Sequence, residues 1–140
     1  MLEDPRVTAL DDHYYKGSLT FDQFVLGANL AAAAYLAQTL KYGVIGWNEN
    51  TLLMTPLLVL GVAAWLGFKR VECTIHLLKV NARYLELCHA NPGRDLSGAR
   101  EVTHEWSKKT GFFYRWRNRS IFLGLASHVG VKLLSAYPIF

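Results

Sequence analysis

The sequence predicts an all-α integral membrane protein: a helical hairpin, a basic cytoplasmic helical insert over residues 69–119, and a third membrane span. Residues 51–68 form an uncharged apolar run that Lys69 and Arg70 follow at once. A run of that length matches a helix crossing a hydrocarbon core of about 30 Å. Eleven of the fifteen Lys and Arg residues lie in the insert beside five acids, which favours a cytoplasmic location for it. A length of 140 residues leaves room for one domain.

The first expected span covers residues 21–45, with Ser18 or Thr20 as its candidate N-cap. The span is rich in alanine and contains several polar residues, so it is a weak membrane helix when taken alone. Its small residues recur at a spacing that allows two helix backbones to approach closely in lipid. We therefore expect one face to pack against another helix through Gly27, Ala31 and Ala34.

A short link over residues 46–50 joins the first span to the second and predicts an antiparallel hairpin. Trp47 in this link is expected at the far membrane interface, where tryptophan is enriched. No glycine or proline interrupts residues 68–90. We therefore expect the second span, residues 51–68, to continue as one long helix into the cytoplasm.

Two apolar seams follow the part of this helix beyond the second span. The members of each seam are three or four residues apart, and charged residues occupy the opposite face. Two seams outside the membrane imply burial against more than one partner, which a chain this small can hardly supply alone. The first seam is Val71, Ile75, Leu78, Ala82 and Leu85, and the second is Cys73, Leu77, Val80, Tyr84 and Leu87.

A helix stop at residues 91–93 precedes a shorter amphipathic helix over residues 96–110, with Asp95 or Ser97 as its cap. The two cytoplasmic helices should pair antiparallel. Four aromatic residues and three arginines then interleave over residues 112–119, which is typical of an aromatic belt with a positive anchor; nucleic-acid binding is less favoured. The expected lipid-interface residues are Trp47, Lys69, Arg70, Tyr114, Arg115, Trp116, Arg117 and Arg119.

Residues 120–140 form the third expected span, which places the N-terminus in the cytoplasm and the C-terminus outside. Its apolar residues outweigh the cost of about 2.5 to 3.5 kcal/mol for one central lysine, Lys132. A re-entrant or surface-lying helix is the alternative for this segment. A polar stripe on the span is a candidate pore lining; the alternative is that His128 serves a helix contact and Lys132 reaches toward the headgroups. The stripe consists of Gly124, His128, Lys132 and Ser135.

Soft metal ligands occur in the insert, but their spacing fits no closed zinc-site pattern, so no metal is expected. A single histidine in an apolar run gives little support for a haem. The sequence contains no recognisable nucleophile and base, no carboxylate pair in an apolar setting and no phosphate-binding glycine loop. We therefore expect no enzyme activity, no catalytic residue and no cofactor. The soft ligands are Cys73, His76, Cys88, His89 and His104.

Two functional classes remain. In the first, the chain assembles with itself as a pore-forming or membrane-disrupting effector or channel. In the second, it is a non-catalytic accessory or anchoring subunit of a larger membrane complex. The layout of hairpin, basic insert and third span resembles small membrane-disrupting effectors of bacterial defence systems. The expected location is the bacterial inner membrane, and the expected partners are anionic lipid headgroups with further copies of the chain or other membrane subunits, without nucleic acid.

Overall fold

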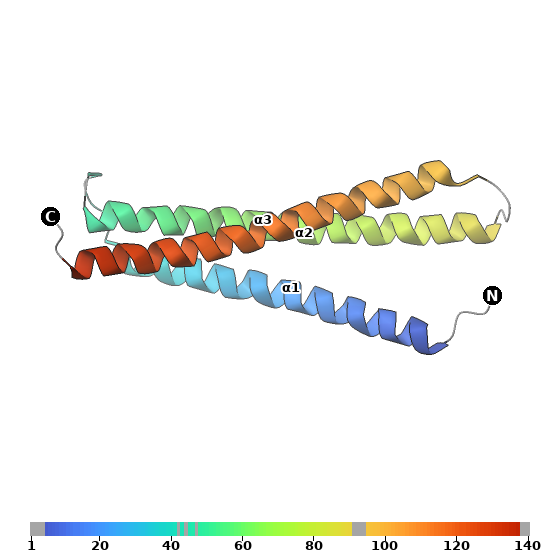
Figure 1. Cartoon of the computed structure of the whole chain (residues 1–140), viewed down its shortest axis with the longest axis horizontal. Coiled ribbons are helices and arrows are strands. Elements are labelled where there is room, and N and C mark those ends of the chain that lie inside the picture. The colour runs from blue at the N-terminus through green and yellow to red at the C-terminus, as the bar shows by residue number, and fades with distance from the viewer. Residues whose placement is uncertain (1–4, 42, 44, 47, 91–94, 138–140) are drawn as a thin grey trace.

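The computed structural model contains three long helices and, among the described residues, no strand (Figure 1). The structure describes residues 5–41, 43, 45–46, 48–90 and 95–137, with the backbone alone for residues 5–12 and 14. The helices are α1 (Pro5–Thr39), α2 (Glu49–Ala90) and α3 (Ser97–Ala136). They alternate in direction, so the chain enters at one end of the bundle and leaves at the other.

The bounds of α1 differ from the prediction at both ends. The helix begins at Pro5, a residue favoured in the first turn because a backbone N–H there would have no helical partner. It ends at Thr39, before the predicted end of the first span. Neither Ser18 nor Thr20 is an N-cap, because both lie inside α1; the Thr20 hydroxyl donates to the carbonyl oxygen of Lys16 at 3.0 Å.

The prediction of one continuous helix from the second apolar run into the insert is confirmed by α2. Asn48 precedes this helix, and its Oδ1 accepts a hydrogen bond from the backbone N–H of Thr51 at 2.8 Å, which is an N-cap interaction. Pro56 is buried inside the helix without ending it. Among the described residues, α2 is the one helix long and apolar enough to cross a membrane, with a mean hydropathy of 1.9 over its most apolar stretch.

A single helix, α3, replaces the two separate segments that the sequence predicts at residues 96–110 and 120–140. It continues through Gly111, where a side chain would meet nothing within 4 Å. A glycine inside a helix costs only about 1 kcal/mol relative to alanine, so it does not end the helix by itself. At the start of α3, the carboxylate of Asp95 accepts a hydrogen bond from the N–H of Ser97 at 2.9 Å, which lowers the pKa of Asp95.

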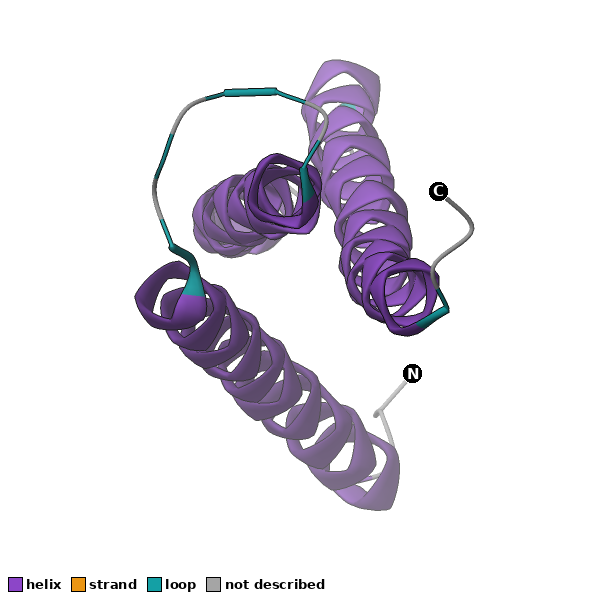
Figure 2. Cartoon of the chain, turned by 90° about the vertical axis from the view of Figure 1, so that its left-hand side faces the viewer, coloured by secondary structure: helices purple, strands orange, loops and turns teal. Residues whose placement is uncertain are grey.

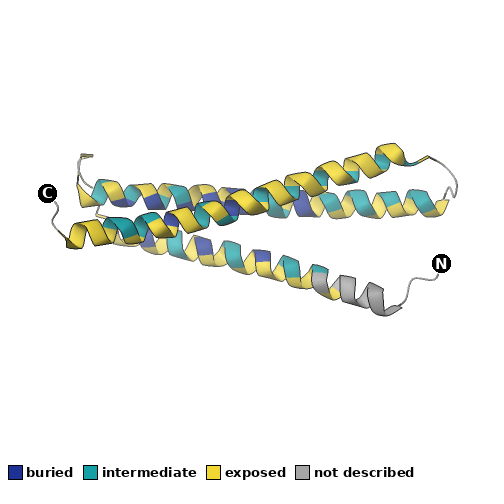
Figure 3. Cartoon of the chain, viewed as in Figure 1, coloured by how far each residue is buried: buried dark blue, intermediate teal, exposed yellow. Residues whose placement is uncertain are grey.

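The middle helix of the bundle is α2, which packs extensively on α3 and more sparsely on α1. Seen from the end where α1 finishes, the three helices occupy the corners of a triangle (Figure 2). α1 leans away from α2 toward its N-terminal end, where the two ribbons diverge. Buried residues gather along α2 and at the centre of the bundle, while the outer faces are exposed (Figure 3).

Two glycines mark the closest approaches between helices. A Cβ added to Gly124 of α3 would lie 2.7 Å from Cδ2 of Leu60, a fully buried residue of α2. A Cβ added to Gly67 of α2 would lie 2.9 Å from Cδ1 of Leu26 on α1. Gly27, the glycine that the sequence favoured for close packing, has nothing within 4 Å of such an atom. The small residues that bring helices together in one chain are therefore Gly67 and Gly124.

The two seams of α2 have different environments. The second seam faces α3: Cys73 is buried, and the other members are half-buried. Nearby, the rings of His76 and Trp106 stack with centroids 4.9 Å apart, which joins α2 to the antiparallel first half of α3. Most of the first seam is exposed, because Ile75, Leu78 and Leu85 have no covering helix. The chain thus buries the second seam and leaves most of the first seam exposed.

Gly124 and Gly130 provide a matched test of close packing on α3. Gly130→Ala should raise the free energy of unfolding by up to about 1 kcal/mol, because its Cβ meets nothing within 4 Å and alanine favours a helix. Gly124→Ala should lower it by about 1 to 2 kcal/mol, because Leu60 has no room to move aside. Unfolding in mild detergent measures both. Equal effects of the two variants would contradict the observed contact.

Candidate functional site

One carboxylate and two guanidinium groups meet inside the bundle. Arg70 Nε donates to Oδ2 of Asp22 at 2.5 Å, and Arg117 Nη1 donates to Oδ1 at 3.0 Å. The side chains of Asp22, Arg70 and Arg117 are only 4%, 11% and 1% exposed. We call this group the Asp22 cluster. It connects all three helices through a single acidic residue.

Each member of the Asp22 cluster stands at the midpoint of its helix. Gly67, one turn before Arg70, lies beside the aliphatic part of Arg117. A Cβ on this glycine would lie 3.5 Å from Cδ of Arg117, so the aliphatic part of the arginine passes over it. The guanidinium group then reaches Asp22 on α1. The cluster therefore lies where α2 and α3 both face α1.

Tyr114 partly offsets the excess positive charge of the cluster. Its ring centroid lies 4.1 Å from Cζ of Arg70 and 5.3 Å from Cζ of Arg117. The negative face of an aromatic ring attracts a cation at these distances. Burial lowers the pKa of the Arg70 guanidinium, whereas the negative charge of Asp22 raises it. The guanidinium stays protonated, because the ordinary pKa of an arginine side chain is far above neutral. Nη2 of Arg117 is buried and has no hydrogen-bond partner among the described residues.

A second charge layer lies at the end of the bundle where α2 begins. Lys132 Nζ donates to Oε1 of Glu49 at 2.8 Å, and both side chains are about half exposed. From Glu49 to Arg70 the rise of the helix is about 30 Å. Residues 23–40, 50–68 and 120–131 between the two layers contain no Asp, Glu, Lys or Arg. The bundle therefore has an uncharged half and a charged half.

Most of the polar stripe predicted on the third span lies against other parts of the chain. Gly124 packs on α2, and Lys132 is paired with α2 through Glu49. Nδ1 of His128 is buried and lacks a hydrogen-bond partner among the described residues. Ser135 donates to the carbonyl oxygen of Val131 within its own helix at 2.9 Å. The stripe thus contributes to contacts between helices in the single chain.

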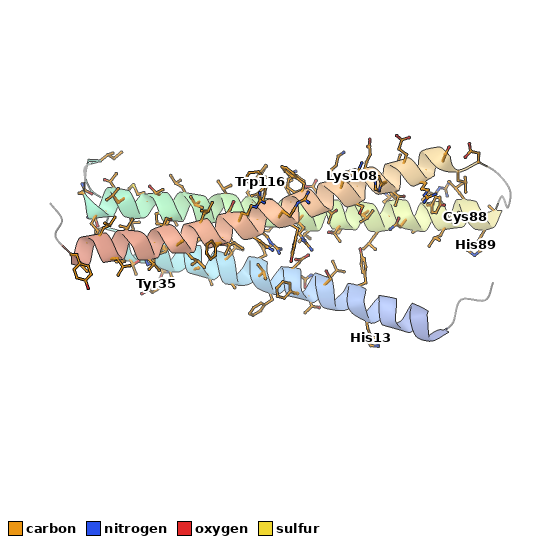
Figure 4. All side chains as sticks on the ribbon, viewed as in Figure 1. His13, Tyr35, Cys88, His89, Lys108 and Trp116 are labelled. Atoms are coloured by element: carbon orange, nitrogen blue, oxygen red, sulfur yellow. The ribbon has the colours of Figure 1, made fainter. Side chains whose placement is uncertain are left out.

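The predicted lipid-interface residues do not share one environment. Arg117 is fully buried, and Arg70 is largely buried with it, so the cluster withdraws both from the surface. Arg115, Trp116 and Arg119 remain exposed, with Cζ of Arg119 lying 5.6 Å from the Trp116 ring centroid. Trp116 projects from the central part of α3 (Figure 4). Tyr114 lies at the cluster, Lys69 pairs with Glu72 at 2.8 Å, and Trp47 lies outside the described residues.

The candidate metal ligands are dispersed. Within the described part of the chain, no three His, Cys, Asp or Glu side chains come close enough to share a metal ion. Burial raises the pKa of the Cys73 thiol, while the ring of His76 stacks on Trp106. Cys88 and His89 lie at the opposite end of α2 from the hairpin link. The insert therefore presents separate side chains rather than a ligand set.

No model of a protein family, no curated protein sequence and no solved structure matches this chain. The two charge layers and the surfaces that the single chain leaves uncovered are therefore the features that bear on its function.

The sequence contained a signal for the Asp22 cluster that the composition of the span obscured. Asp22 is the only acidic residue between Asp12 and Glu49, and it begins an apolar run. An acid in such a setting is expected to have a basic partner. Arg70 and Arg117 are members of basic groups that also match interface anchors, so spacing alone did not distinguish the buried arginines from the exposed ones.

Asp22→Asn should lower the free energy of unfolding by about 3 to 5 kcal/mol, because it leaves two buried guanidinium groups without a counter-charge. Arg117→Met should cost less, since Asp22 and Arg70 remain as a balanced pair. Denaturation in mild detergent measures both changes.

The exposed pair Lys69 and Glu72 supplies the control, because Glu72→Gln removes a surface ion pair and should change stability little. If Arg117→Met proved as costly as Asp22→Asn, the loss of packing rather than the charge balance would determine the stability of the cluster.

Proposed function

We propose that this chain is a three-span membrane protein that assembles with copies of itself. The observation that supports the membrane arrangement is the separation of the two charge layers by about 30 Å of uncharged helix. That distance equals the usual thickness of a bilayer hydrocarbon core. Charged residues are costly inside this core and are expected at its boundaries. The Asp22 cluster and the Glu49 pair occupy these positions.

In this proposal α1 and α3 cross the membrane beside α2. Neither α1 nor α3 is as apolar as α2. Each nevertheless lacks charged residues over the part that lies in the uncharged half of the bundle. Both helices also present large apolar side chains outward, including Phe24, Leu30, Phe122 and Leu133. Lipid would cover these side chains, which water would solvate poorly. The charged half, with residues 69–119, would lie in the cytoplasm with the N-terminus.

Surfaces left uncovered by the single chain support self-assembly. In the charged half, Ile75, Leu78 and Leu85 of the first seam are 59%, 39% and 56% exposed. Lipid would not reach this seam, and an exposed apolar stripe in water marks a contact with another protein. In the uncharged half, α1 leaves its small-residue face exposed at Gly27 and Ala31. Such a face suits close packing against a helix of a second copy.

Pore formation or membrane disruption is the activity that we propose for the assembly. The proposed pore would be lined by helix faces that different copies bring together. Gly124 and Lys132 would not line it, because they already contact α2 within one chain. Arg115, Trp116 and Arg119 would contact anionic headgroups at the cytoplasmic boundary. An accessory or anchoring subunit is the alternative, in which helices of other proteins cover the same seam. Neither proposal involves enzyme activity.

Leu78→Glu tests the assembly. It should reduce the mass of the purified complex in mild detergent toward that of one chain, because a carboxylate in the first seam opposes burial. Lys79→Glu, an exposed neighbour, introduces the same side chain outside the seam and should leave the mass unchanged.

The composition and the membrane activity of the complex formed by the unmutated chain also distinguish the two functional classes. A complex made only of this chain that releases dye from vesicles would support the pore, whereas a constant stoichiometry with other membrane proteins would support the accessory subunit. A monomeric parent would contradict self-assembly.

The membrane topology can be tested with single cysteines placed at glycines that have open space around them. In a background with Cys73→Ser and Cys88→Ser, a cysteine from Gly43→Cys, between the end of α1 and the start of α2, should react with an impermeant thiol reagent added outside the cell. A cysteine from Gly98→Cys at the start of α3 should react only after the membrane is opened, because the basic insert stays inside. The reverse pattern would contradict this topology.

A further inference from the structure

An exposed face of α3 changes from positive charge to apolar side chains at the middle of the bundle. Arg115 and Arg119 are both exposed and stand one helical turn apart, so about 6 Å separates their Cβ atoms. The same face continues toward the C-terminus of α3 with Phe122 and Leu123, which are 74% and 60% exposed. Cationic groups therefore stand at one end of this face and uncovered apolar groups at the other.

The two exposed arginines have no carboxylate partner in the described part of the chain. Residues 106–140 contain no Asp or Glu, so α3 itself supplies no acid near them. The Asp22 cluster cannot supply one either, because its single carboxylate already contacts two buried guanidinium groups. Arg115 and Arg119 thus add two uncompensated positive charges beside a cluster that itself retains one.

Aromatic rings on the same helix position one of these arginines. Cζ of Arg119 lies 5.6 Å from the ring centroid of Trp116, and that ring lies 6.1 Å from the ring of Phe112. Both rings are about half exposed, and Trp116 points outward (Figure 4). A guanidinium group beside an aromatic face keeps N–H groups free to donate. An anion that binds there loses less free energy to side-chain ordering than it would at an unsupported arginine.

The order of groups along this face matches the order of groups in an anionic phospholipid. A phosphate would lie between Arg115 and Arg119, and the acyl chains would follow Phe122 and Leu123 into the uncharged half. A free phosphate or a nucleic acid would satisfy the guanidinium groups but would leave the apolar end uncovered. Charge selects further, because a phosphate monoester carries about −1.5 to −2 at neutral pH. A diester carries a single charge, so the monoester balances two arginines better.

We propose that this face binds a phospholipid whose headgroup is a phosphate monoester, with Arg115 and Arg119 donating to the same phosphate. The site rests on the proposed membrane arrangement, which places the middle of α3 at the cytoplasmic boundary, and it names the class of lipid bound there. It requires neither a pore nor a second copy, since one chain supplies every residue named.

A pair of short-chain lipids tests the site. Dioctanoyl phosphatidic acid and dioctanoyl phosphatidylglycerol have the same acyl chains, but the first is a phosphate monoester and the second a diester. Added at neutral pH to the full chain in mild detergent, phosphatidic acid should raise the melting temperature more and should bind about fivefold more tightly. Glycerol phosphate carries the same monoester without acyl chains and should have little effect.

Three matched variants locate the effect. Arg115→Gln and Arg119→Gln should each remove most of the difference between the two lipids, because each leaves one guanidinium group for the phosphate. Lys108→Gln removes a positive charge from an exposed site nearer the start of α3 and should preserve the difference. All three side chains are exposed, so the melting temperature without lipid should stay close to that of the parent.

Equal binding of the two lipids by the parent, or a difference that persists in both arginine variants, would overturn the proposal. Equal stabilisation by glycerol phosphate would also overturn it, because free phosphate would then be the ligand. So would tighter binding of a single-stranded oligonucleotide, since nucleic acid would then be the occupant. Thiol labelling reports separately on the membrane arrangement: reversed labelling of the Gly43→Cys and Gly98→Cys variants contradicts the topology, whereas the lipid comparison in detergent tests the site alone.

Discussion

The ion pairs from Arg70 and Arg117 to a single carboxylate, that of Asp22, are the interaction on which the bundle depends. α1 packs sparsely on α2, so few other contacts determine where it lies. The hydrogen bond from Asn29 to the carbonyl oxygen of Leu60 is one of them. A buried charge is stabilised only when its partner is correctly placed, and a slip of one residue along α1 would separate Asp22 from both arginines. The cluster therefore sets the register of α1 against the pair formed by α2 and α3.

The location of the cluster divides the three helices into an uncharged half and a charged half. Because its members stand at the helix midpoints, the residues on one side are uncharged up to Glu49 and Lys132, and those on the other side carry most of the charge. The uncharged side fits a lipid environment in the proposed arrangement. On the charged side, the second seam of α2 packs on α3 and the first seam stays exposed. Lipid and a second copy would cover different parts of the same three helices.

Helices were predictable from the sequence where the apolar pattern was continuous. The long helix through the second apolar run and the insert is present in α2, and the antiparallel pairing of its second half with the next helix is present too. The starts of helices were less predictable. The polar residues before the first apolar run extend α1 back to Pro5, and Gly111 does not divide α3. Neither polar residues nor a single glycine end a helix when no other local structure is more stable.

By itself the sequence determined the helical class, the uncharged run of α2, the concentration of basic residues in the insert and the existence of two seams on α2. Only the tertiary structure decided which small residues and which arginines are used inside the chain. Gly67 and Gly124, rather than Gly27, allow the close approaches, and Arg70 and Arg117 turn inward to Asp22. The physical reason is that local spacing assigns a residue to a helix face, whereas the partner of that face depends on how three helices, distant in sequence, cross and pack together.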